Sequence, residues 1–163
     1  MNVKVPIYRL KLIKERTMNV CQRVLDQPFA AARFVERWIG AADREHLVAV
    51  FLDAECRIVG AQVVAVGSLD HAHTTAREVF KAAILANSHG LILGHNHPSG
   101  SLAPSDQDIR TTKKLVFLGN MLGIRVLDHV IVSRNGFRSM HEMGLVLTPT
   151  KTSDDEKCDG MNS

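Results

Sequence analysis

The sequence predicts one domain of the α/β (α+β) class, in which helices pack on a mixed β-sheet. Its 163 residues correspond to one domain, at roughly 100–200 residues per domain. Hydrophobic residues make up 45% of the chain and charged residues 23%, values that support a packed core and exclude a disordered or fibrous protein. Segments with strand-like and helix-like periodicity alternate along the chain, as is typical of this class.

The first half of the domain is predicted to contain a helix, a hairpin and a second helix. Apolar residues recur at helical spacing over 29–39, and Gly40 ends that segment. Two β-rich runs, 46–52 and 57–67, are joined by a short polar turn, which is typical of a hairpin. The segment 76–87 then presents a second apolar face at helical spacing.

The second half is predicted to begin with a short buried strand, 91–94, that leads into His95. Residues 96–104 contain two prolines, a glycine and two serines, which indicates a loop. The remaining predicted elements are a helix over 105–122 that ends at Gly123, a strand over 124–133 and a short strand over 137–140.

The basic charge of the chain is concentrated near its N-terminal end. Residues 1–18 carry five basic and one acidic residue, a net of +4, whereas residues 19–150 carry 13 basic and 12 acidic residues, a net of +1. We therefore divide the chain into a basic arm (1–23) that could pair as an edge strand, a domain (24–146), and a polar, acidic tail (147–163) that we expect to be disordered. The near-neutral domain does not indicate a nucleic-acid-binding body.

The composition favours a cytoplasmic protein. No apolar stretch reaches the length of about 18 residues that a membrane span needs. Lys11 and Lys14 interrupt the apolar residues of the arm, and no small-residue cleavage site follows, which argues against a secretory signal. The three cysteines are odd in number and widely spaced, without a CxxC pair, as expected of thiols in a reducing compartment.

The strongest candidate for chemistry is the pair His95 and His97. Side chains at i and i+2 at the end of a strand point to the same face, so two imidazoles can reach one metal ion. A catalytic zinc site commonly has three protein ligands and an open position for water. The third ligand should come from the next helix, which offers Asp106 and Asp108 in its first turn.

The same residues also have a structural explanation. Ser105-x-x-Asp108 is close to a capping box, in which Ser105 accepts from a backbone N–H and Asp108 favours the positive end of the helix. An isolated H-x-H is often a structural pair. Capping and metal binding are nevertheless compatible, because Ser105 can cap the helix while Asp108 faces an ion.

The combined pattern resembles the JAMM motif of the JAB/MPN metalloprotease fold. The motif here is His95-x-His97-x10-Asp108, with Ser105 three residues before the aspartate. The blocks GHNHPSGSLAPSDQDI and LGIRVLDHVIV resemble the RadC-like branch of that superfamily, in a short form without the N-terminal helix-hairpin-helix region. The resemblance implies a single MPN/JAB-like domain, a mixed β-sheet flanked by helices with cytidine-deaminase-like layering.

The resemblance also implies roles for individual residues. Zn²⁺ would be held by His95, His97 and Asp108 with a water as the fourth ligand, and Ser105 would hold that water or stabilise the developing oxyanion. The family needs a glutamate general base at the start of the early strand, and Glu45 matches that place. Without the resemblance, Glu45 is more simply a solvated charge at a helix-to-strand junction. Glu78, in the second predicted helix, is a rival base.

These features favour a zinc-dependent hydrolase, a metallopeptidase that acts on a peptide, isopeptide or similar amide of an unknown protein or peptide substrate. The alternative is a DNA-associated accessory protein with a structural or inactive metal site, whose basic arm contacts phosphate. A third hypothesis is a scaffold protein that mediates assembly and has no catalytic activity. The intact set of candidate ligands argues against it. Asp128-His129, on a predicted strand, is either a polar pair near the site or a hydrogen-bonded structural pair.

Overall fold

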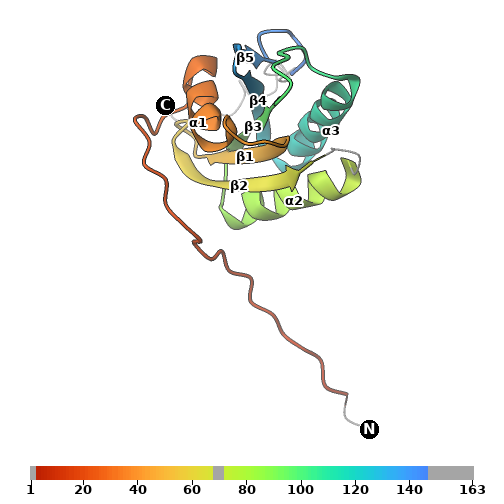
Figure 1. Ribbon diagram of the computed structural model, residues 1–163. Helices are drawn as coiled ribbons and strands as arrows, with labels where there is room; N and C mark the ends of the chain where they lie inside the picture. Colours follow the sequence, from red (N-terminus) through yellow and green to blue (C-terminus); the bar gives the residue numbers. More distant parts are fainter. Residues whose placement is uncertain (1–2, 68–71, 147–163) are drawn as a thin grey trace, which may run out of the picture.

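The computed structural model describes residues 3–67 and 72–146, the second range with side chains from residue 76 onward, and shows a five-stranded mixed sheet with three helices (Figure 1). The predicted α/β class is confirmed. The elements are α1 (Pro28–Ile39), β1 (His46–Leu52), β2 (Ile58–Val66), α2 (Ala72–Leu85), β3 (Gly90–Asn96), α3 (Asp106–Leu122), β4 (Arg125–Ser133) and β5 (Gly136–Ser139).

The strand order in the sheet is β2-β1-β3-β4-β5, and together with the strand directions it brings three strand ends and the start of a helix to one edge of the sheet. β1 pairs antiparallel with both β2 and β3, whereas β3 and β4 are parallel and are connected through α3. The carboxyl ends of β3 and β4 therefore lie at the same edge as the amino end of β1. A crossover helix between parallel strands begins at that edge as well, so the start of α3 joins them.

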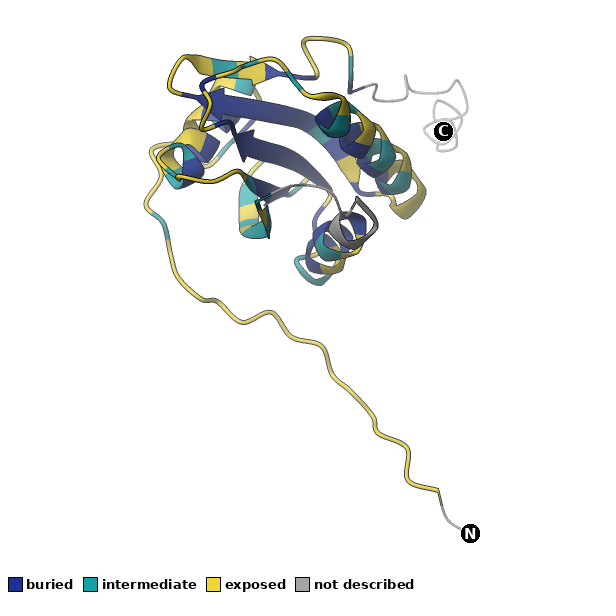
Figure 2. Cartoon of the chain, turned by 45° about the vertical axis from the view of Figure 1, so that its right-hand side comes forward, coloured by how far each residue is buried: buried dark blue, intermediate teal, exposed yellow. Residues whose placement is uncertain are grey.

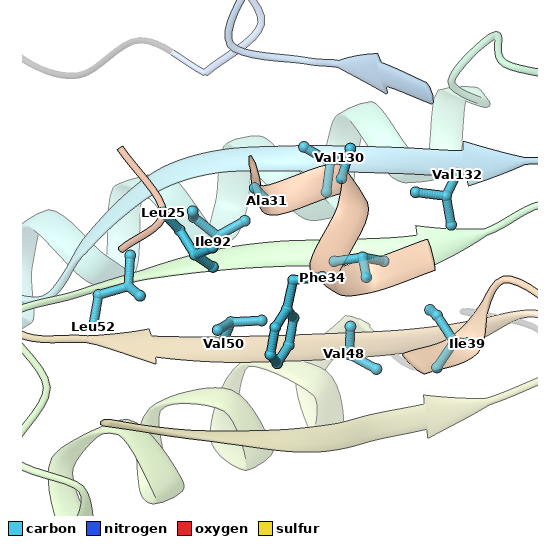
Figure 3. Packing of buried hydrophobic residues seen from close by; sticks show 12 residues of the cluster. Leu25, Ala31, Phe34, Ile39, Val48, Val50, Leu52, Ile92, Val130 and Val132 are labelled. Atoms are coloured by element: carbon cyan, nitrogen blue, oxygen red, sulfur yellow. The ribbon is translucent and has the colours of Figure 1, made fainter. Parts of the chain in front are cut away.

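The two faces of the sheet pack against different helices, as strand alternation requires. On one face, α1 covers a cluster that includes Val48, Val50, Ile92 and Val130, and Figure 3 shows these side chains beneath the helix. On the other face, α2 and α3 cover a cluster built from alternate strand residues and from helix residues such as Phe80. Figure 2 shows the central strands as the most deeply buried part of the molecule.

A glycine in β3 allows α1 to lie very close to the sheet. A Cβ atom at Gly94 would lie 2.5 Å from Cγ2 of Val35, a side chain with no exposed surface. Any side chain at position 94, which directly precedes His95, would therefore collide with Val35 of α1. The close approach of helix and strand depends on the missing Cβ.

Both ends of α3 have the local chemistry that the sequence predicts. Ser105 is the N-cap, and its hydroxyl accepts from the Asp108 N–H while the Asp108 carboxylate accepts from the Ser105 N–H, which is a complete capping box. Gly123 follows the helix with a φ of 68°, the left-handed conformation that glycine adopts without steric cost.

Two sequence expectations need correction. The second helix begins at Ala72 and ends at Leu85, so it starts earlier than the predicted segment 76–87. The arm does not form an edge strand: residues 3–20 have neither helix nor strand structure, and a single bridge joins Val24 to Arg57. The apolar side chains of the arm have no sheet edge to pair with and are 51–97% exposed between Val3 and Ile13.

Figure 1 shows the arm running away from the body of the protein. The tail predicted for 147–163 lies outside the described residues. Within the described ranges, no helix combines the length and apolar character that crossing a bilayer requires.

We predict that deletion of residues 1–16 leaves the free energy of unfolding within about 0.5 kcal/mol of the full chain, because this part of the arm buries almost no apolar surface. Denaturant unfolding of both forms, followed by circular dichroism, measures the difference. Leu25→Ala, which truncates a buried core residue, should in contrast cost about 2–5 kcal/mol. Loss of the cooperative transition in the truncated chain would show that the arm belongs to the fold.

Candidate metal centre

Three side chains from two elements converge at the carboxyl end of β3. His95 lies in β3, His97 follows the strand directly, and Asp108 lies in the first turn of α3. The two Nε2 atoms of His95 and His97 are 2.7 Å apart, and Oδ2 of Asp108 is 3.5 Å from the first and 3.6 Å from the second. The sequence prediction that these residues lie together is confirmed.

The arrangement fits a metal ion of the size and coordination of zinc. All three side chains are buried, with 2–8% of the residue surface exposed, and their potential ligand atoms lie within 4.8 Å of one another. In a tetrahedral zinc site with bonds of about 2.0–2.1 Å, ligand atoms lie about 3.3 Å apart. The two distances to Asp108 are close to that spacing, and the two imidazoles would need to separate by about half an ångström.

The backbone around His97 fixes its ring. The His97 N–H donates to the carbonyl of Val132 in β4 at 2.9 Å, and a tight turn follows in which the Gly100 N–H donates to the His97 carbonyl. Nδ1 of the ring lies 3.1 Å from the carbonyl oxygen of Ser101. Because a carbonyl only accepts, Nδ1 carries the proton, and the lone pair of Nε2 in the neutral ring is left for a metal ion in the space shared with His95 and Asp108.

Asp108 is ionised in this environment. Burial raises the pKa of its carboxyl, but the hydrogen bond and charge of a protonated His95 and the hydrogen bonds from Ser105 outweigh burial and hold the pKa well below its usual range. A metal ligand must be deprotonated, so a carboxylate with a depressed pKa is suited to this role at neutral pH.

Ser105 lies at the solvent side of this group. It is exposed, whereas Asp108 beneath it is buried, and its hydroxyl donates to Oδ2 of Asp108 at 2.7 Å. The hydroxyl also accepts from the Asp108 N–H at 3.1 Å. The capping alternative for Ser105 and Asp108 is confirmed. It is compatible with metal binding, because the capping pair lies directly beside the two histidines.

Glu45 precedes β1 at the same edge of the sheet. Leu47 is opposite His95 in the antiparallel pair, so alternation places Glu45 on the His95 face and near the level of His97. Glu45 is exposed, and its carbonyl accepts from the Gly67 N–H. This location is compatible with the predicted role of general base, which stays a prediction. The rival, Glu78, pairs with Lys81 on α2.

Asn96 connects the Glu45 segment to the strand that carries the histidines. Its side chain is buried, and its Oδ1 accepts from the His46 N–H at 2.7 Å. Its Nδ2 donates to the Arg44 carbonyl at 2.9 Å. The amide thus holds the backbone on both sides of Glu45, a role that the sequence analysis missed because nothing local to Asn96 identifies its partners.

Asp128 and His129 have separate roles. The Asp128 carboxylate accepts from the Ser139 hydroxyl at 2.7 Å and from the His141 N–H at 3.0 Å, which fixes the turn after β5. His129 is fully buried and lies beside the metal-ligand candidates, with its Nε2 2.8 Å from Nδ1 of His95. Burial lowers the pKa of His129 well below its usual value, and the nearby charge of His95 adds to that effect.

Comparison with known proteins agrees with this geometry. The family model described as RadC-like JAB domain matches residues 25–145. A UPF0758 protein from Finegoldia magna is 42% identical over 118 residues, which cover 72% of this chain and 53% of the relative. A UPF0758 protein from Methanococcoides burtonii is 47% identical over 103 residues, covering 63% and 45%, and one from Shouchella clausii is 37% identical over 134 residues, covering 82% and 58%.

The chain spans about half the length of these relatives. The match to the family model nevertheless covers most of the chain, from the residues just before α1 to those after β5, and contains every residue of the site. With a mixed sheet, a strand-end histidine pair and an aspartate at the start of the following helix, the chain belongs to the RadC-like JAB domain family.

Proposed function

We propose that this chain is a zinc-dependent hydrolase that cleaves a peptide, isopeptide or similar amide bond. The observation that carries the proposal is the convergence of two imidazole Nε2 atoms and one carboxylate oxygen in a buried position at the end of β3. Two nitrogen ligands and one oxygen ligand form a set that zinc commonly takes in catalytic sites. A bound zinc would supply a water of lowered pKa and a Lewis acid for the scissile carbonyl.

Glu45 and Ser105 would carry the proton transfers and the charge stabilisation. Glu45 accepts one proton from the attacking water and delivers it to the nitrogen of the leaving amine when the C–N bond breaks. The Ser105 hydroxyl, exposed beside Asp108, would turn its one proton from Oδ2 of Asp108 to the carbonyl oxygen as negative charge develops on it. His95, His97 and Asp108 would hold the metal ion.

The substrate would approach over the edge of the sheet. Pro98, Ser99 and Ser105 border the site and are exposed. A hollow of about 410 Å³ lies between α1 and residues 20–22, on the opposite face of the sheet from His95, so it does not lead to the metal ligands. An extended peptide segment fits an open edge of this kind better than a small, enclosed molecule does.

The alternative function is a DNA-associated accessory role. It is favoured by one observation, the exposure of all five basic side chains of residues 3–18, Lys4, Arg9, Lys11, Lys14 and Arg16. Binding to duplex DNA that weakens steeply with salt, and that is lost on deletion of residues 1–16, would support it. Both functions are compatible with the cytoplasmic location that the cysteine pattern favours.

We predict about one zinc ion per purified chain, bound at the His95, His97 and Asp108 group. His95→Ala and His97→Ala should each abolish stoichiometric binding, and Asp108→Ala should weaken it, because each change removes one of three protein ligands. Elemental analysis after dialysis measures the content, with His89→Ala as a histidine control away from the group. Stoichiometric zinc in the His95→Ala, His97→Ala double variant would contradict the assignment.

We predict that Glu45→Gln lowers turnover by roughly 10²–10⁴ while zinc content and stability stay unchanged, because it removes a proton acceptor and not a ligand. Turnover is measured on quenched-fluorescent peptides and on peptides joined through a lysine isopeptide bond. Glu36→Gln, an exposed substitution on α1 at the opposite face, is the matched control. Turnover of Glu45→Gln equal to that of Glu36→Gln would remove Glu45 from the mechanism.

A further inference from the structure

A chain of three hydrogen bonds runs behind the metal-ligand candidates, on the side away from solvent. It joins Nδ1 of His95 to Nε2 of His129 at 2.8 Å, and Nδ1 of His129 to the Thr112 hydroxyl at 2.6 Å. The Thr112 hydroxyl in turn lies 2.6 Å from the carbonyl oxygen of Asp108, one helical turn earlier in α3. All four residues are buried, and the chain therefore connects two of the proposed ligands through groups that exclude water.

The direction of each hydrogen bond follows from the last acceptor. A carbonyl oxygen only accepts, so the Thr112 hydroxyl donates its proton to Asp108; its other contact, to Sδ of Met140 at 3.7 Å, is to a weak acceptor. The Thr112 oxygen must then accept from Nδ1–H of His129. In the neutral ring of His129, Nε2 consequently has no proton and must accept from Nδ1–H of His95.

We infer that His129 and Thr112 are positioning residues that hold His95 in the tautomer protonated at Nδ1. In that tautomer, the lone pair of His95 Nε2 lies on the side of the ring that faces His97 and Asp108, where a metal ion would bind. His129 is not itself a fourth ligand, because its Nε2 is occupied by His95. The inference rests on the metal-binding part of the proposed function and not on the hydrolytic part.

The two histidines are thus prepared for a metal by different means. For His97, the acceptor of the Nδ1 proton is the backbone carbonyl of Ser101, which has no second protonation state. For His95, the acceptor is a side chain whose own tautomer depends on Thr112. If His129 were protonated at Nε2 instead, His95 would have to accept at Nδ1 and carry its proton at Nε2, where the metal should bind.

Substitutions at Thr112 test the inference with little change in packing. Thr112→Val keeps the size and branching of the side chain and removes the hydroxyl, whereas Thr112→Ser keeps the hydroxyl. We expect Thr112→Val and His129→Met to weaken zinc affinity by about 10–100-fold, the usual effect of losing a partner behind a ligand. Thr112→Ser should bind zinc within about threefold of the wild-type chain.

Zinc affinity is measured by competition with a chromophoric chelator, without substrate, on the full chain. Leu93→Val is the control for a purely structural effect, because Leu93 is buried and lies opposite His129 in the β3–β4 pairing. It should lower stability and leave zinc affinity unchanged. Equal zinc affinity in Thr112→Val, Thr112→Ser and the wild-type chain would overturn the inference.

A spectroscopic measurement tests the tautomers directly in the metal-free chain. Long-range ¹H–¹⁵N spectra of the histidine rings distinguish Nδ1–H from Nε2–H, and we expect Nδ1–H at both His95 and His129. In Thr112→Val the His129 signals should shift toward a mixture of tautomers. A wild-type His129 protonated at Nε2, or a His95 without a proton at Nδ1, would overturn the inference, even if every variant folds.

The two proposals fail in different ways. A wild-type chain that binds no zinc contradicts the proposed function, while the ring spectra still decide whether His129 sets the tautomer of His95. A wild-type chain that binds zinc, with variants that bind it equally well, contradicts only the role of His129 and Thr112.

Discussion

The site depends on the hydrogen bonds and contacts of one oxygen, Oδ2 of Asp108. This oxygen caps α3 and also faces the two candidate histidine ligands. Oδ2 accepts from the Ser105 N–H and hydroxyl, which completes the cap of α3, and it also faces the two histidines. The first turn of α3 therefore cannot move without moving the carboxylate that we propose as the third metal ligand. The helix start is stabilised by an anion, and the same negative charge lies where a metal ion would need it.

The sheet topology supplies the other half of this arrangement. The parallel pairing of β3 with β4 makes α3 begin at the edge where His95 and His97 lie, and the antiparallel pairing of β1 brings Glu45 to the same edge. Residues separated by about 50 positions in the chain thus meet without a long loop. The Asn96 amide strengthens this meeting point by bonding the backbone on either side of Glu45.

The parts of the structure that could be predicted from the sequence are those with local causes. The cap at Ser105, the stop at Gly123 and the orientation of the H-x-H pair depend on neighbours within a few residues. The edge strand that the arm could have formed is absent from residues 3–20, because alternation of apolar residues is local whereas a strand needs a partner elsewhere in the chain. His129 and Thr112 could not be assigned from the sequence, since only the β3–β4 register and the position of α3 bring them behind His95.

The contact between Gly94 and Val35 limits how related chains can vary. Because the atoms of Val35 fill the space where a Cβ of residue 94 would stand, the two positions share one volume. A larger residue at position 94 is tolerable only with a smaller one at position 35, so the two should covary among family members. Such covariation would show, from sequences alone, that α1 packs closely against β3 on one face of the sheet. The candidate metal ligands at the carboxyl end of β3 lie on the opposite face.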